Sequence, residues 1–221
     1  MEVRQLRPGL WRWTARHPDW RPEDLEDGAG WGEVVASYSV ESDDGLVLID
    51  PLAPVRGSEH DERFWSALDR DVARLGPPHV LLTIYWHARS SQEILDRFAG
   101  ARVWAYEPAA QLVGERVRYT DTFGAGDRLP GGIEAIDAKR IREALFWLPA
   151  HRALIAGDVL LGSGDRLHVC PDSWLGDRDP NEFRASLRPL LELPIELLLL
   201  THGEPVEEHA REALRSALDS R

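Results

Sequence analysis

The sequence predicts a single domain of mixed α/β composition with two similar halves, and three observations lead to this. The chain has 221 residues, of which 43% are hydrophobic and 29% charged, values typical of one globular domain with a layered core. Short apolar strand patterns alternate with helical patterns, and this alternation recurs after a break near residues 120–130. The chain contains no repeat of solenoid period and no low-complexity linker. We therefore expect one domain over residues 1–221.

The N-terminal segment, residues 1–32, is rich in tryptophan. Its pattern predicts a strand at residues 10–14, where apolar and polar side chains alternate, and a long loop at residues 17–32, which is rich in Pro, Gly and acids. We expect this segment to pack on the domain, because aromatic side chains bury large areas. The alternative is that the loop overhangs a functional site and forms an aromatic wall.

The remainder of the first half alternates strands with helices. Residues 80–83 are fully apolar, as in strands buried in the middle of a sheet. The helix over residues 58–75 has an apolar stripe and ends before Gly76. The predicted strands are residues 34–40, 46–49, 80–83 and 102–105, and the predicted helices are residues 58–75 and 91–98.

The second half repeats the alternation with the same types of element. The predicted strands are residues 133–136, 144–148, 153–155 and 196–200, and the predicted helices are residues 181–191 and 206–218.

The charge and cysteine content limit the partners and the compartment. The net charge is −12, which argues against nucleic acid or an anionic membrane as the partner, because both require a basic surface. No stretch is apolar over a membrane-spanning length. The single cysteine, Cys170, is consistent with a reducing compartment. We expect a cytoplasmic protein that binds a small molecule; its oligomeric state stays open.

Four segments occur in an order and spacing that resemble the metallo-β-lactamase superfamily. Each is a strand pattern followed by polar residues, and they cover residues 45–51, 80–83, 153–158 and 198–203. The resemblance spans roughly residues 10–205. It implies an α+β fold, a four-layered αββα sandwich, with a metal site at one edge of the sheets.

In that superfamily, a threonine at a strand end is followed by the ligand motif His-x-His-x-Asp-His. Here Thr83 is followed at those positions by side chains that do not normally bind zinc: Ile84, Trp86, Ala88 and Arg89. Lys139 falls near the next ligand position. Asp158 and His202 match the last two, and the resemblance makes them the candidate catalytic and metal-binding residues. We therefore expect no cofactor, with zinc or another divalent metal as the alternative.

An unpaired buried carboxylate at Asp158 costs several kcal/mol, about the penalty of burying one ion. Lys139 and Arg89 are cations near ligand positions, and we expect one or both to pair with Asp158 in place of a metal. Asp50 ends its strand and is expected to support the site structurally by accepting hydrogen bonds.

His87 has two interpretations. It is either a polar loop residue beside the core, or the loop is shifted by one residue so that His87 reaches Asp158 and His202. Three such ligands with a water molecule form a mononuclear catalytic metal site.

Three function hypotheses follow from the resemblance. The first is a zinc-free protein whose cationic pocket binds a small anionic or aromatic molecule through Tyr85, Trp86, His87, Arg89 and Lys139. The second is a metal-dependent hydrolase with a non-standard site of Asp158, His202 and His87. The third is a non-catalytic scaffold that binds a protein partner through the tryptophan-rich N-terminal segment. We expect the first; the sequence does not identify a substrate.

Overall fold

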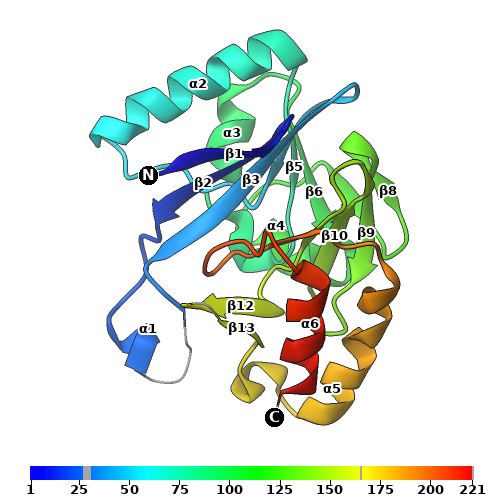
Figure 1. Cartoon of the computed structure of the whole chain (residues 1–221). Coiled ribbons are helices and arrows are strands. Elements are labelled where there is room, and N and C mark those ends of the chain that lie inside the picture. The colour runs from blue at the N-terminus through cyan, green and yellow to red at the C-terminus, as the bar shows by residue number, and fades with distance from the viewer. Residues whose placement is uncertain (27–30, 165, 221) are drawn as a thin grey trace.

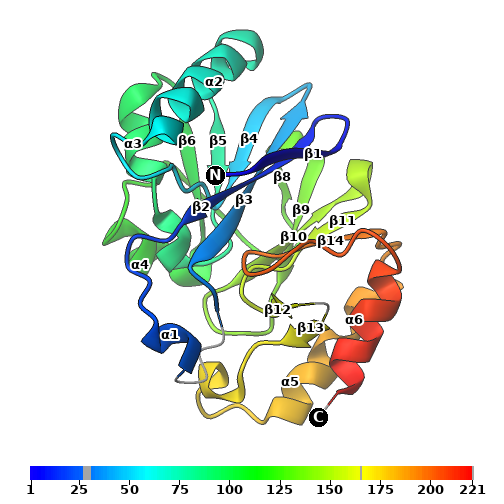
Figure 2. The same cartoon turned by 60° about the vertical axis from the view of Figure 1, so that its left-hand side comes forward.

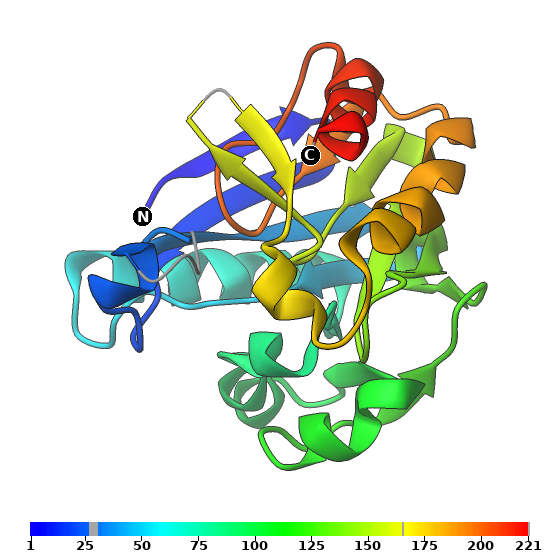
Figure 3. The same cartoon turned by 90° about the horizontal axis from the view of Figure 1, so that it is seen from below.

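The computed structural model describes residues 1–26, 31–164 and 166–220. Figure 1 shows two β-sheets packed between helices, and Figures 2 and 3 show the same layers from the side and from below. Residues 27–30, which form part of the predicted N-terminal loop, are outside the described residues.

The first sheet has seven strands in chain order. Strands β1 to β4 are antiparallel neighbours, and β4 to β7 are parallel. The strands are β1 (Val3–Arg7), β2 (Leu10–Arg16), β3 (Val34–Ser42), β4 (Gly45–Ile49), β5 (His79–Leu81), β6 (Arg102–Tyr106) and β7 (Asp121–Phe123). The predicted N-terminal strand is thus part of this sheet, beside a further strand, β1.

The second sheet has five strands in the order β14-β11-β10-β9-β8, and a separate two-stranded hairpin lies between β11 and β14 in the chain. Strands β11 and β14 are parallel, whereas the other neighbours are antiparallel. The strands are β8 (Arg128–Leu129), β9 (Ile133–Asp137), β10 (Ala144–Leu148), β11 (Ala153–Ile155), β14 (Leu197–Leu199) and, in the hairpin, β12 (Leu160–Ser163) and β13 (Arg166–Val169).

Helices cover the outer face of each sheet. The first sheet carries α2 (Glu59–Leu75), α3 (Ser91–Arg97) and α4 (Ala110–Gly114), and the second carries α5 (Pro180–Leu187) and α6 (Ala210–Asp219) (Figure 1). The expected four-layered α+β sandwich is confirmed. No helix among the described residues is both long and apolar enough to cross a membrane.

Alternation along the buried strands explains these layers. On β10, Phe146 and Leu148 belong to the core between the sheets, while Leu145 and Trp147 join the core under α5 and α6. Successive side chains of a strand point to opposite faces, so a fully apolar strand packs on both sides. This is why the strands in the second half of the chain are short, continuous runs of apolar residues.

Three predicted elements differ from the structure. The loop at residues 17–32 contains a short helix, α1 (Glu23–Glu26). The last helix begins at Ala210 and not at Val206, because Val206 exchanges two backbone hydrogen bonds with Leu198. Helix α5 continues only as a 3₁₀ turn over Arg188–Glu192.

Two contacts between the halves of the chain bring the strand ends together. Ile84 forms a β-bridge with Glu143, and the Ala36 backbone N–H donates to the Thr201 carbonyl at 2.8 Å. The residues that follow β4, β5, β11 and β14 therefore meet at one edge of the two sheets, where the resemblance locates a metal site.

Candidate functional site

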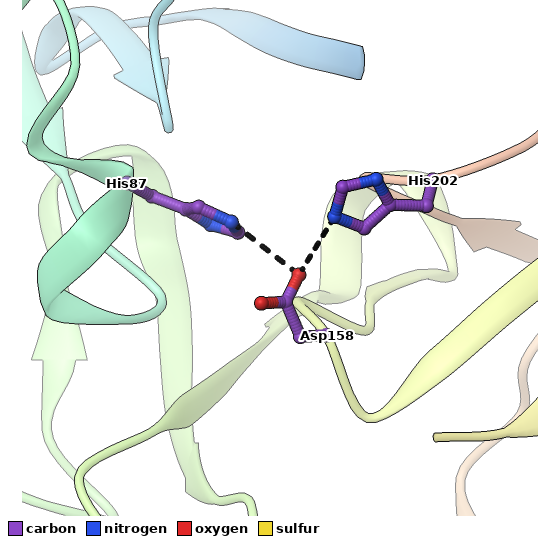
Figure 4. A group of neighbouring side chains, drawn as sticks. All are labelled: His87, Asp158 and His202. Carbon is purple, nitrogen blue, oxygen red and sulfur yellow. Dashed lines mark ion pairs between the residues drawn. The ribbon is translucent and has the colours of Figure 1, made fainter. Parts of the chain in front are cut away.

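His87, Asp158 and His202 meet at this edge, although they come from three separate segments (Figure 4). His87 lies in the 3₁₀ turn Tyr85–Ala88 that follows β5, Asp158 follows β11, and His202 follows β14. All three residues are buried, with 2%, 3% and 6% of their surface exposed respectively. His87 therefore reaches Asp158 and His202, as its second interpretation expected.

One carboxylate oxygen lies between the two imidazole rings. Asp158 Oδ1 is 3.3 Å from His87 Nε2 and 3.3 Å from His202 Nε2. Both separations exceed the 2.7–2.9 Å of charge-assisted hydrogen bonds, and Oδ1 has no hydrogen-bond donor among the described residues. It is a buried acceptor faced by two nitrogens.

His87 is oriented from behind by a carboxylate and a hydroxyl group. Its Nδ1 lies 3.0 Å from Asp50 Oδ2 and 3.0 Å from Thr83 Oγ1. Asp50 also accepts the Thr83 backbone N–H at 2.9 Å and the Thr83 hydroxyl at 2.5 Å. A carboxylate at Nδ1 fixes the tautomer in which Nε2 carries a lone pair, the usual arrangement behind metal-binding histidines.

Asp158 is fixed by two groups that sequence reasoning did not identify in this role. Trp86 Nε1 donates to Asp158 Oδ2 at 2.8 Å, and the Asp158 backbone N–H donates to Glu143 Oε1 at 2.6 Å. Glu143 is fully buried. The second oxygen, Oδ1, is thereby directed at the imidazoles.

His202 is positioned by packing. Its ring lies 5.1 Å from that of Trp31 in an edge-on arrangement. Its Nδ1 is buried and has no hydrogen-bond partner among the described residues. Beside it, a Cβ on Gly203 would approach Gly162 Cα to 2.7 Å, so the β12–β13 hairpin lies directly against this turn.

The electrostatics follow from two carboxylates beside one imidazole. Burial and Arg89 oppose charge on His87, but Asp158 and Asp50 raise the pKa of His87 above its ordinary value. Burial alone would raise the pKa of Asp158, yet His87 and His202 bring that pKa well below the usual range. Burial lowers the pKa of His202. The arrangement stabilises positive charge on His87 and negative charge on Asp158.

The donor set fits a divalent metal ion. Two imidazole nitrogens and one carboxylate oxygen are common ligands of zinc, and the three candidate ligand atoms lie within 4.8 Å of one another. Tetrahedral zinc with bonds of about 2.0–2.1 Å separates its ligand atoms by about 3.3 Å. The two measured N–O separations have this value.

The site is at the base of a cavity of about 960 Å³. Its wall contains three tryptophans, Trp31, Trp86 and Trp174. Five arginines (Arg16, Arg56, Arg89, Arg116 and Arg140) and four acids (Asp19, Asp61, Glu93 and Asp158) also line it. The cavity is therefore rich in arginine within a chain of net charge −12.

The expectation that Lys139 or Arg89 pairs with Asp158 is wrong. Lys139 Nζ pairs with Asp137 at 2.9 Å on the surface, and Lys139 does not line the cavity. Two residues of this loop, Lys139 and Arg142, have positive φ, and it is the neighbouring Arg140 that lines the cavity. Arg89 Nη1 donates to the carbonyl of Asp50 at 3.0 Å, so it contacts backbone rather than Asp158.

Tyr85 lies outside the cavity lining, and the four residues at the ligand positions after Thr83 differ in where they lie. The Tyr85 ring packs 4.6 Å from that of Trp86, but it is not part of the cavity lining. Ile84 and Ala88 are buried apolar residues. Of residues 84–89, Trp86, His87, Ala88 and Arg89 line the cavity.

Trp31 lies beside His202, as the alternative of an aromatic wall from the N-terminal loop expected. Arg140, Glu143 and Trp174 also contribute to the site and were not identified from the sequence. Glu143 immediately precedes a strongly apolar strand, and this charged residue beside a buried strand is the one sequence signal that could have indicated a buried hydrogen bond. The others lie in irregular segments, where side-chain direction has no periodicity to read.

The sequence matches no protein-family model and no curated protein. Solved structures nevertheless share the whole fold. A metallo-β-lactamase from Pontibacter korlensis has a TM-score of 0.72 at 17% identity, covering 100% of this chain and 99% of that one. The mono-zinc form of FIM-1, a metallo-β-lactamase from Pseudomonas aeruginosa, has a TM-score of 0.68 at 12% identity over 99% and 94% of the two chains.

A metal-soaked Flv1 flavodiiron core from Synechocystis sp. PCC6803 also has a TM-score of 0.72, at 17% identity, covering 98% of this chain and 59% of that one. At these identities the likeness establishes the fold. The chain has the metallo-β-lactamase fold, as the order of its four segments indicated.

Proposed function

We propose that the protein binds one divalent metal ion through His87, Asp158 and His202 and hydrolyses a small substrate in the cavity above it. The observation that carries this proposal is Asp158 Oδ1, buried without a hydrogen-bond donor and equidistant from two imidazole nitrogens. Burying an unsatisfied charged acceptor is costly, so a cation at this point offsets the cost.

The residues of the chain have distinct roles in this proposal. Asp50 and Thr83 orient His87 so that Nε2 faces the cavity floor. Trp86 occupies the other oxygen of Asp158 and leaves Oδ1 as the ligand atom. Three protein ligands leave an open coordination position, as in catalytic rather than structural zinc sites. A metal ion bound there supplies Lewis-acid chemistry and activates water for hydrolysis.

The metal-free pocket is the second candidate. Arg140, flanked by two tryptophans in the cavity wall, favours binding of an anionic or aromatic molecule with or without a metal. What weighs against a purely metal-free site is that neither Lys139 nor Arg89 neutralises Asp158. The scaffold hypothesis has less support: among the described residues, the exposed tryptophan is Trp86, which lines an open cavity.

The test is the metal content of the purified protein after growth in zinc-supplemented medium, measured by plasma mass spectrometry. We expect near-stoichiometric metal that is lost from the Asp158→Ala/His202→Ala double variant. The control variant Asp44→Ala/His60→Ala removes the same residue types away from the cavity and should retain the metal.

Hydrolysis is then measured with a chromogenic β-lactam, an aryl ester and an aryl phosphate. Turnover of at least one that is abolished by a chelator and restored by zinc supports the proposal. A folded protein with no metal above background would overturn it and leave the metal-free pocket.

A further inference from the structure

Arg140 is a rigid cation in the cavity wall. Its Cζ lies 5.6 Å from the ring centroid of Trp86 and 5.3 Å from that of Trp174. Its Nη1 donates to Glu143 Oε2 at 2.8 Å, and its side chain is 7% exposed. Two aromatic faces and a buried carboxylate fix a guanidinium group in one orientation, so little entropy is lost when it binds a ligand.

One edge of this guanidinium is unused. Nε and Nη2 donate to no acceptor among the described residues, and neither is among the fully buried unpaired atoms. Both are thus reachable from the cavity that Arg140 lines. The parallel N–H groups of this edge match the two oxygens of a carboxylate or phosphate.

The other cavity arginines are less suited to this task. Arg16 and Arg56 pair with Glu33 and Glu93, and their side chains are 71% and 88% exposed. Arg116 is exposed on the surface. Arg89 contacts backbone carbonyls, and its Nε is sealed from solvent. Arg140 combines burial, fixed orientation and an open donor edge.

Arg140 is adjacent to the candidate metal ligands. The Glu143 carboxylate accepts from Arg140 with one oxygen and from the Asp158 backbone with the other. Trp86 also touches both, through its ring and its Nε1. A single carboxylate group thus separates the guanidinium from Asp158.

We propose that Arg140 is the specificity-determining residue of the cavity and binds an oxyanion of the substrate, a carboxylate or phosphate, through its Nε–Nη2 edge. This inference rests on the proposed function and names its substrate class. The substrates are small anionic esters or amides whose oxyanion lies a few bonds from the bond that is cleaved, with apolar parts packing on Trp86 and Trp174.

The experiment measures binding of benzoate, phenyl phosphate and the uncharged analogue benzamide by calorimetry, first with chelator-treated protein and then with zinc. Binding without metal tests Arg140 separately from the metal proposal. Benzoate and phenyl phosphate are compared to distinguish a carboxylate from a phosphate site. The variants are Arg140→Gln, Arg140→Lys and, as the matched control, Arg142→Gln, an exposed arginine two residues away.

In the wild-type protein, we expect one of the anions to bind about 10- to 100-fold more tightly than benzamide. Arg140→Gln should abolish this preference and leave benzamide unchanged, Arg140→Lys should retain part of it, and Arg142→Gln all of it. If Arg140→Gln does not fold because Glu143 loses its partner, the Arg140→Gln/Glu143→Gln variant keeps an acceptor for Asp158. Equal binding of anions and benzamide, no binding of either anion, or a preference that persists in a folded variant without Arg140 would overturn the inference.

Discussion

Replacing Asp50 with asparagine changes one group that contacts His87 Nδ1 and is expected to move the imidazole proton of His87 from Nδ1 to Nε2. The Thr83 hydroxyl donates its only proton to Asp50 at 2.5 Å. Both oxygens that face His87 Nδ1, each at 3.0 Å, are therefore acceptors, so the imidazole proton is on Nδ1. In Asp50→Asn, the amide oxygen keeps the Thr83 backbone N–H, and the amide NH₂ faces Nδ1 and donates to it. The proton then moves to Nε2, which no longer offers a lone pair.

The expected magnitude comes from the loss of this support. Removing the group that orients a metal-binding histidine reduces metal affinity about 10- to 100-fold, which equals about 1.4–2.8 kcal/mol. The lost negative charge acts in the same direction. Because Asp50 is not one of the three candidate metal ligands, the metal affinity should fall but not be abolished.

Competition with a chromophoric zinc chelator measures the affinity, and thermal unfolding in excess EDTA tests whether the metal-free variant is folded. Asp61→Asn is the control: it removes one acid from the cavity wall, and Asp61 has no contact with His87. If Asp50→Asn is folded and binds zinc within twofold of the wild-type protein, Asp50 does not set the tautomer and the reasoning is refuted.

Three further predictions concern stability and reactivity. Gly157→Ala should lower the free energy of unfolding more than Gly164→Ala does, and for Gly164→Ala we expect a loss of about 1–2 kcal/mol. Both glycines have φ near the same value (+53° and +57°), but a Cβ at Gly157 would lie 2.5 Å from Glu143 Oε1, whereas one at Gly164 would lie within 4 Å of no described residue other than its chain neighbours. Denaturant unfolding measures the difference, and equal losses of stability would exclude the clash. Asp179 Oδ1 accepts two backbone N–H groups at the start of α5, each at 2.9 Å, so Asp179→Ala should cost about 1 kcal/mol in the same assay; no loss would mean that the cap is dispensable. Burial raises the pKa of Cys170 to about 12, so at pH 8 it should react with a thiol reagent only on unfolding, and fast labelling of the native protein would contradict its burial.

Most strands and helices were predictable because their signals are local and repeated, whereas the four-layered sandwich was implied by the resemblance of four segments to a known superfamily. The apolar runs that become β4, β10 and β11 are short and are flanked by polar turns, so both their pattern and their length indicate strands. The β12–β13 hairpin lacks such a signal, since its strands are four residues each and five of these eight residues are not buried. Its pairing depends on contacts with the turn at Gly203, which are distant in sequence.

The site was predictable only where a strand end fixes the residue. Asp158 and His202 each lie three residues beyond the end of a buried strand, and the sheets bring those ends together. Which of Lys139 and Arg140 enters the cavity depends on backbone rotation at positive φ, a feature that sequence spacing does not encode. His87 was undecided for the same reason: a 3₁₀ turn, and not a strand, sets its direction.

The symmetry of the contacts at Asp158 bears on what neutralises it. A proton on one imidazole forms one hydrogen bond, which shortens to about 2.7–2.9 Å and leaves the other ring at a longer distance. Here the two Nε2 atoms are equally distant, at 3.3 Å, and neither contact satisfies Oδ1. Nearby Arg89 donates to backbone carbonyls and is not available for this oxygen. The single metal ion proposed above, shared by both rings and the carboxylate, would give equal distances, whereas one proton would shorten only one of them.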